Sequence, residues 1–163
     1  MNRLVTAAVC VLWAAAAGAG EEPKTEPQAE KPARKNRAAV LYDTGAALPE
    51  PGAGPLVIEA EKWTKMAGTA AIKGDAVLCN QWTAAVVRKD GAGVELYAHT
   101  ADGWAHRARL ALLAGEGTVK FEGAQGTVEG QDAAVEVKQA GGAGTVTFRL
   151  TVGDPLLKAT AKG

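Results

Sequence analysis

Short runs of β-branched and apolar residues alternate with glycine-bearing breaks along most of the chain, and this rhythm limits what it can fold into. The runs cover residues 56–61, 69–73, 82–88, 94–100, 104–113, 118–122, 127–129, 133–138 and 145–152. Breaks such as Gly-Asp, Asp-Gly and Gly-Gly separate them at a spacing of about ten residues, which is typical of antiparallel strands joined by turns. The pattern therefore predicts an all-β fold, a jelly-roll-like antiparallel β-sandwich over residues 38–163.

The last run shows the alternation most clearly. Threonine and arginine at 145, 147, 149 and 151 alternate with apolar residues at 146, 148, 150 and 152, which predicts a strand with one buried and one solvated face. A short apolar patch at residues 40–42 suggests an additional first strand. Residues 45–55 hold three prolines and three glycines and are expected to form a loop.

The N-terminal residues have the features of an export signal. Arg3 is followed by an apolar run over residues 4–17, and Ala17-Gly18-Ala19 matches the small-residue pattern of a cleavage site, so we expect residues 1–20 to be removed near Gly20. Residues 21–37 are charged and proline-rich with no large apolar side chain, which predicts a disordered linker. The sequence thus predicts an exported protein, periplasmic or extracellular, without a membrane span after cleavage.

Composition excludes several chemistries. The chain has 18 basic and 18 acidic residues and lacks the basic excess that nucleic-acid binding requires. It contains no serine, which excludes the serine hydrolases. Cleavage would remove Cys10 and leave Cys79 alone, without an internal disulfide. Because Cys79 follows an apolar run, we expect a buried thiol, although pairing between chains or a nucleophilic role are the alternatives.

Two histidines flank a predicted turn. A two-residue Asp102-Gly103 loop would place His99 opposite His106 as a possible zinc or copper site. A three-residue loop, 101–103, would instead place His99 opposite Ala105 and His106 on the other side. The apolar pattern favours the longer loop, because only that register brings the apolar faces of the two strands together. The same register predicts that Glu95 faces Arg109 and that Tyr97 faces Arg107, the latter as a possible cation–π contact.

Carboxylates and tryptophans are the remaining candidate site residues. Glu59 and Glu61 would point the same way from a strand, so one could have a raised pKa for acid–base work, or both could hold a hard cation such as calcium, although a solvated outer face is the explanation we favour. Trp63, Trp82 and Trp104 lie at predicted strand ends, where exposed indoles could stack on sugar rings. The alternative is that they fill a core in which only 27 of residues 38–163 are Val, Leu, Ile or Phe.

Residues 56–63, Leu-Val-Ile-Glu-Ala-Glu-Lys-Trp, resemble the opening strand of carbohydrate-binding modules of families 6 and 35. Residues 92–97, followed by Ala-Asp-Gly at 101–103, resemble an internal strand of the same modules. The resemblance implies a galactose-binding-like β-sandwich, with a structural calcium held by Glu59, Glu61 and a late aspartate, for which Asp154 is the candidate. It also implies a sugar site, for which Trp63, Trp82, Trp104 and Tyr97 are the candidates.

These observations favour a non-catalytic exported module that binds a carbohydrate or another component of the cell envelope. The alternative is a structural or protein-interaction module of the envelope, docked through a sheet edge or the charged leader. An enzyme is the third hypothesis, and it would require Asp, Glu and His side chains gathered in one cleft.

Overall fold

The computed structural model describes residues 37–51, 55–91, 93–114, 117–142 and 144–163. The predicted signal peptide and all of the predicted linker except Arg37 lie outside the described residues. Within the described ranges, no helix is long and apolar enough to cross a membrane.

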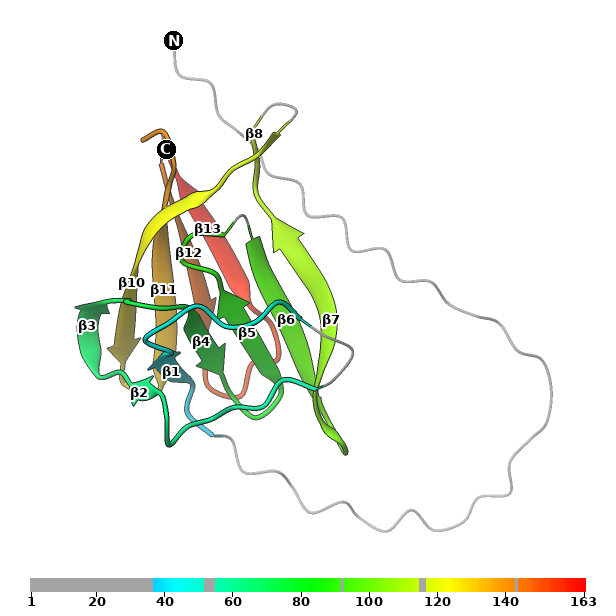
Figure 1. The fold of residues 1–163 in the computed structure, drawn as a ribbon. Helices are drawn as coiled ribbons and strands as arrows, with labels where there is room; N and C mark the ends of the chain where they lie inside the picture. Colours follow the sequence, from blue (N-terminus) through cyan, green and yellow to red (C-terminus); the bar gives the residue numbers. More distant parts are fainter. Residues whose placement is uncertain (1–36, 52–54, 92, 115–116, 143) are drawn as a thin grey trace, which may run out of the picture. The chain divides into compact units, whose positions relative to one another are not determined.

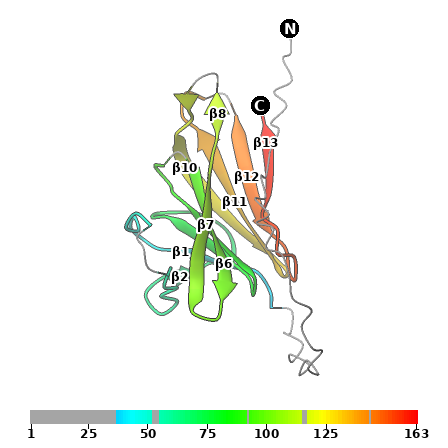
Figure 2. The same ribbon diagram turned by 90° about the vertical axis from the view of Figure 1, so that its right-hand side faces the viewer.

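Two antiparallel sheets pack face to face, which confirms the predicted β-sandwich (Figures 1 and 2). The first sheet runs in the order β2 (Thr64–Lys65), β1 (Val40–Asp43), β4 (Ala76–Cys79), β5 (Thr83–Val87), β6 (Gly93–Thr100) and β7 (Gly103–Ala111). The second sheet runs in the order β13 (Lys158–Lys162), β12 (Thr145–Leu150), β11 (Asp132–Gln139), β10 (Phe121–Glu129) and β3 (Gly68–Ala71). Strands β8 (Leu113–Ala114) and β9 (Gly117–Thr118) form a small separate hairpin, which lies in the sequence between β7 of the first sheet and β10 of the second.

Each sheet is built around a meander. Strands β4 to β7 follow one another in the first sheet, and β10 to β13 follow one another in the second. Two early strands instead pair with strands that do not follow them directly in the sequence: β1 pairs with β4, and β3 pairs with β10. The strands are thus ordered mainly by hairpins rather than by the Greek-key connections of a jelly roll.

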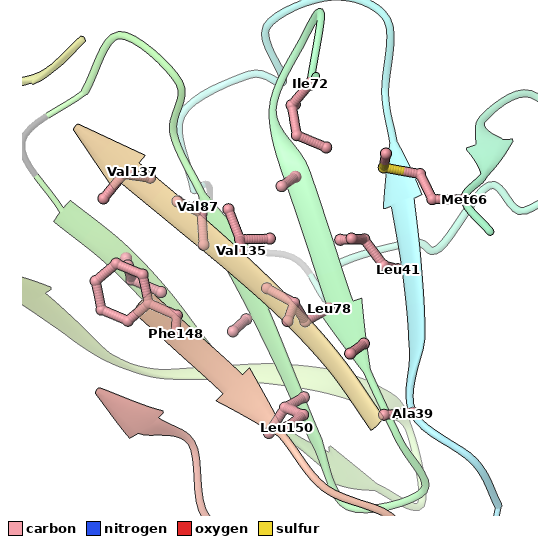
Figure 3. Close-up of a cluster of buried hydrophobic side chains, with 14 of the residues drawn as sticks. Ala39, Leu41, Met66, Ile72, Leu78, Val87, Val135, Val137, Phe148 and Leu150 are labelled. Atoms are coloured by element: carbon pink, nitrogen blue, oxygen red, sulfur yellow. The ribbon is translucent and has the colours of Figure 1, made fainter. Parts of the chain in front are cut away.

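The core lies between the sheets, as Figure 3 shows. Leu41, Leu78 and Val87 project from the first sheet and meet Val135 and Phe148 of the second, and all five are almost fully buried. Each such side chain contributes about 1.5–3 kcal/mol by leaving water. On β12 the predicted alternation is confirmed, because its apolar residues are buried while its threonines and arginine are partly or fully exposed.

One small residue sets how closely the sheets approach. A Cβ atom on Gly126 of β10 would lie 2.6 Å from Leu41 Cδ2 and 2.9 Å from the sulfur of Met66. The side chains of Leu41 on β1 and of Met66, between β2 and β3, therefore occupy the space that any larger residue at 126 would need.

Two strand predictions need correction. Residues 56–61 do not form a strand: Leu56 makes one bridge to Trp104, and the chain then turns, with the Lys62 and Trp63 amides donating to the Glu59 carbonyl. The strands predicted at residues 118–122 and 127–129 are not separate: residues 121–122 and 127–129 lie in the continuous strand β10, while Thr118 belongs to β9. Gly123, with φ of 80°, lies where the pairing register of β10 shifts between Phe121 and Ala124, so this glycine forms an irregularity within a strand instead of a break.

Candidate functional site

A long segment covers the outer face of the first sheet. We call residues 44–51 and 55–63 the strap; they cross in front of β4 and β5 in Figure 1. Leu48, Leu56 and Ile58 of the strap pack against a second apolar cluster on that face, which includes Val86 and Tyr97. Strands β4 and β5 are consequently covered on both sides, which explains why nearly every residue in them is buried.

Three charged side chains lie buried beneath the strap. Arg88, just after β5, donates from Nε and Nη2 to the two carboxylate oxygens of Glu95 on β6, at 3.2 and 2.9 Å. Its Nη1 atom also donates to Asp75 at 3.0 Å. Nη1 and Nη2 further donate to the carbonyls of Leu48 and Pro49 in the strap. All five N–H groups of the guanidinium are therefore engaged.

The contacts in this cluster raise the pKa values of Arg88 and of the neighbouring Tyr97. Burial alone would lower the pKa of Arg88, but the hydrogen bond and charge of Glu95, together with Asp75, raise it. The Tyr97 hydroxyl donates to Glu95 at 3.1 Å, and burial followed by the neighbouring Glu95 charge raises the pKa of Tyr97 to about 12. Arg88 thus stays charged at neutral pH, and the Tyr97 hydroxyl stays protonated.

Two aspartates hold down the start of the strap. Asp43 accepts hydrogen bonds from the backbone amides of Gly45, Lys73 and Gly74, all at 2.9 Å. Burial opposes ionisation, but these three amides lower the pKa of Asp43. Asp75 accepts from the Leu48 amide at 2.8 Å. Together with the hydrogen bonds from Arg88 to Leu48 and Pro49, these bonds hold the strap in place over the first sheet.

Between the strap and the sheet lies a cleft of about 240 Å³. Its walls include Glu50, Glu59 and Trp63 from the strap, and Arg88 and Tyr97 from the sheet. The lining combines apolar ring surface with carboxylates that remain accessible to water, an arrangement suited to a small polar ligand with an apolar face. We take this cleft as the candidate binding site.

Of the four predicted aromatic site residues, only Trp63 and Tyr97 line the cleft. Both are largely buried, and the Trp63 ring packs edge-on against Tyr42 at 6.1 Å. Trp104 is half-buried and packs against His99, with ring centroids 4.8 Å apart. Trp82, in the turn between β4 and β5, is the most exposed of the three tryptophans at 38% but does not line the cleft.

The predicted calcium ligands are not brought together. Glu59 lies in a turn and pairs with Lys62 at 2.8 Å, and Glu61 is exposed in the same turn. Asp154 follows β12, where it accepts from the Leu156 amide at 2.9 Å and pairs with Lys158 at 3.0 Å, and these contacts lower its pKa. No group of three His, Cys, Asp or Glu residues in the described part of the chain could hold a metal ion. These residues therefore do not fit a calcium site.

Between the turn and Arg107, the histidine hairpin takes a register that neither predicted loop provides. Near the turn, His99 faces Trp104 and Tyr97 faces His106. The register then shifts by one residue at Arg107, after which Glu95 faces Arg109 as predicted. The predicted Tyr97–Arg107 pair and the placement of His106 on the other side are therefore wrong. The two imidazoles are diagonal neighbours, and His106 packs edge-on against Tyr97 at 5.2 Å.

Cys79 is buried, as predicted, and is a free thiol. Burial raises its pKa from 9.0 to about 11. The sulfur is thus protonated at neutral pH and is not an activated nucleophile.

Sequence reasoning missed the charged cluster and Glu50. One signal pointed to the cluster: Glu95 and Tyr97 alternate with Val94 and Leu96, so a strap long enough to cover that face would bury them. The sequence alone does not show that the proline-rich loop folds back over the sheet.

Comparisons of the chain with protein-family models, curated proteins and solved structures give no match.

Proposed function

We propose that this chain is an exported, non-catalytic binding module, and that it holds a carbohydrate of the cell envelope in the strap cleft. The observation that carries the proposal is the lining of the cleft. Val57 supplies exposed apolar surface beside the largely buried rings of Trp63 and Tyr97, while Glu50 and Glu59 supply accessible hydrogen-bond acceptors for hydroxyl groups. A sugar presents both kinds of surface, because its C–H faces are apolar and its rim carries hydroxyls.

The resemblance to carbohydrate-binding modules supports the same ligand class. Residues 56–63, the first of the two stretches that carry that resemblance, supply Val57, Glu59 and Trp63 to the cleft. They do so as a loop and a turn instead of an opening strand.

The states of the reactive groups support a binding role over catalysis. The Cys79 thiol is buried and protonated. Arg88 and Glu95 are committed to each other and to the strap, so neither is placed to move a proton to or from a ligand. Export rests on the leader features of the sequence.

A second candidate is a protein-interaction module, and the edge of the first sheet favours it. Strand β7 is nine residues long and mostly exposed, and in the described residues the strap contacts its free edge by a backbone bond only at Trp104. An open edge of this kind can accept a strand from a partner.

Calorimetric titration with a panel of envelope glycans tests the proposal. Val57 lines the cleft and is 67% exposed, so Val57→Phe should obstruct the cleft without disturbing the core. Leu156→Phe is the matched control, because Leu156 is 66% exposed and lies outside the cleft. We expect saturable binding that Val57→Phe weakens at least tenfold and Leu156→Phe leaves unchanged. Absence of binding across the panel, or equal effects of the two variants, would contradict the proposal.

A further inference from the structure

The charge distribution of the cleft restricts its ligand further. Resting on the proposed function, we propose that the strap cleft selects saccharides that carry a free protonated amine, held by Glu50 and Glu59, and excludes acidic saccharides. Some charged groups in the cleft are already paired within the protein, and others remain available to a ligand.

Arg88 is the only cation among the residues that line the cleft in the described part of the chain, and it is not available to an anion. Its five N–H groups are all donated, three to Asp75 and Glu95 and two to strap carbonyls. A ligand carboxylate or sulfate could bind Arg88 only by breaking one of these bonds and leaving a buried acceptor unsatisfied.

The wall behind the cleft also repels anions. One guanidinium faces two carboxylates there, Asp75 and Glu95, so the buried cluster carries an excess of one negative charge. Because these groups are shielded from water by the strap, their field is screened less than that of surface charges. Among the described residues that line the cleft, an acidic saccharide would therefore find no free cation, and it would face this negative wall.

The two carboxylates at the mouth of the cleft are, in contrast, available. The Glu50 side chain is 78% exposed and meets Arg109 only at 3.8 Å. The Glu59 side chain is 41% exposed and pairs with Lys62, itself 73% exposed. Exposed pairs of this kind are weak, so a ligand ammonium can replace either partner and form charge-assisted hydrogen bonds. Neither Arg109 nor Lys62 lines the cleft.

Three matched oligosaccharides test the inference by calorimetry at a pH where the amine is protonated. They are glucosamine oligomers, their N-acetylated counterparts and glucuronic acid oligomers of the same length. We expect the amine form to bind at least tenfold more tightly than the neutral form, and the acidic form to bind most weakly. If the acidic oligomer binds as tightly as the neutral one, or the amine gives no advantage, the inference is overturned while the proposed function stands. If none of the three binds and the wider glycan panel also fails, both are overturned.

Variants that replace a carboxylate with a neutral amide test whether Glu50 and Glu59 cause the preference for the amine form. Glu50→Gln and Glu59→Gln should each reduce the preference for the amine form at least threefold, while changing the affinity for the N-acetylated form less than twofold. Glu61→Gln is the matched control, because Glu61 is exposed in the same turn but does not line the cleft, and it should preserve the preference. An equal loss of preference in Glu61→Gln would show that overall charge, not the cleft, attracts the amine, and would overturn the inference.

Discussion

Arg88 and Glu95 form a two-point ion pair beneath the strap, with Nε–Oε1 and Nη2–Oε2 distances of 3.2 and 2.9 Å. Arg88 follows β5 and Glu95 lies on the neighbouring strand β6, so the pair links two adjacent strands of the first sheet. The same guanidinium donates to the carbonyls of Leu48 and Pro49. One side chain thus connects the sheet, the buried carboxylates and the wall of the cleft.

Removing the Arg88 guanidinium should destabilise the folded protein. Arg88→Met leaves Glu95 and Asp75 buried without their cation, and we expect a loss of about 3–5 kcal/mol in the free energy of unfolding. Urea denaturation measures this loss. Arg149→Met is the control, because Arg149 is exposed and its nearest carboxylate, on Asp132, is 3.8 Å away; it should cost under about 1 kcal/mol. A similar small loss for Arg88→Met would contradict the role assigned to the cluster.

Gly126 should tolerate no side chain. In Gly126→Ala the new methyl group would overlap Leu41, Met66 and Ile72, so we expect a loss of about 1–3 kcal/mol from overpacking. Gly117→Ala, where a Cβ meets nothing within 4 Å, should change stability by less than about 0.5 kcal/mol. Thermal unfolding of the two variants measures the difference, and equal melting temperatures would show that the sheets are less closely packed than described.

Stability should fall at alkaline pH. The thiol of Cys79 has its pKa raised by burial from 9.0 to about 11, so between these values it ionises in the unfolded chain but not in the folded one. Its contribution is complete below pH 9 and is lost as the pH rises toward 11, amounting to about 3 kcal/mol. Tyr97, with a pKa of about 12, extends the decline to higher pH.

The pH dependence has a direct check. In a Cys10→Ala background, a thiol reagent at pH 8 should react with Cys79 only after unfolding, since the folded thiol is buried. Cys79→Ala should flatten the fall of unfolding free energy between pH 9 and 11. Rapid modification of the folded chain would contradict the buried, protonated state.

Calcium should not stabilise the protein. Glu59 and Asp154 are each paired with a lysine, and the three predicted ligands do not form a group that could hold a metal ion. Melting curves with millimolar calcium and with chelator should therefore coincide. A clear rise of the melting temperature with calcium would show that these carboxylates rearrange into a site.

Much of the fold could be predicted from the sequence, because hairpins between consecutive strands dominate it. Glycine-bearing turns delimited β5, β6, β7, β11 and β12, and two-residue alternation marked all of these except β5; their partners lie next to them in the chain. Strand β4 was missed because both of its faces are buried, so residues 76–79 show an unbroken apolar run without alternation. Strand β13 was missed because all of its residues are exposed, leaving no apolar face to detect.

Less of the candidate site could be predicted from the sequence, because the site depends on contacts between residues that are distant in the sequence. Residues 56–61 have the composition of a strand, yet their apolar side chains cover the first sheet instead of pairing in it. The irregularity at Arg107 likewise could not be predicted, since the apolar pattern sets the register only beyond it. Trp63 and Tyr97 were identified as candidates, but their meeting in one cleft with Glu50 depends on the path of the strap.

The measurement that tests the account most directly is a set of amide chemical shifts recorded during titration with glucosamine oligomers. If the strap cleft is the binding site, the perturbed amides will cluster at Glu50, Glu59, Trp63, Arg88 and Tyr97, while those of the second sheet stay unchanged. Perturbations confined to the edge of β7 or to the second sheet, or none at saturating ligand, would contradict it.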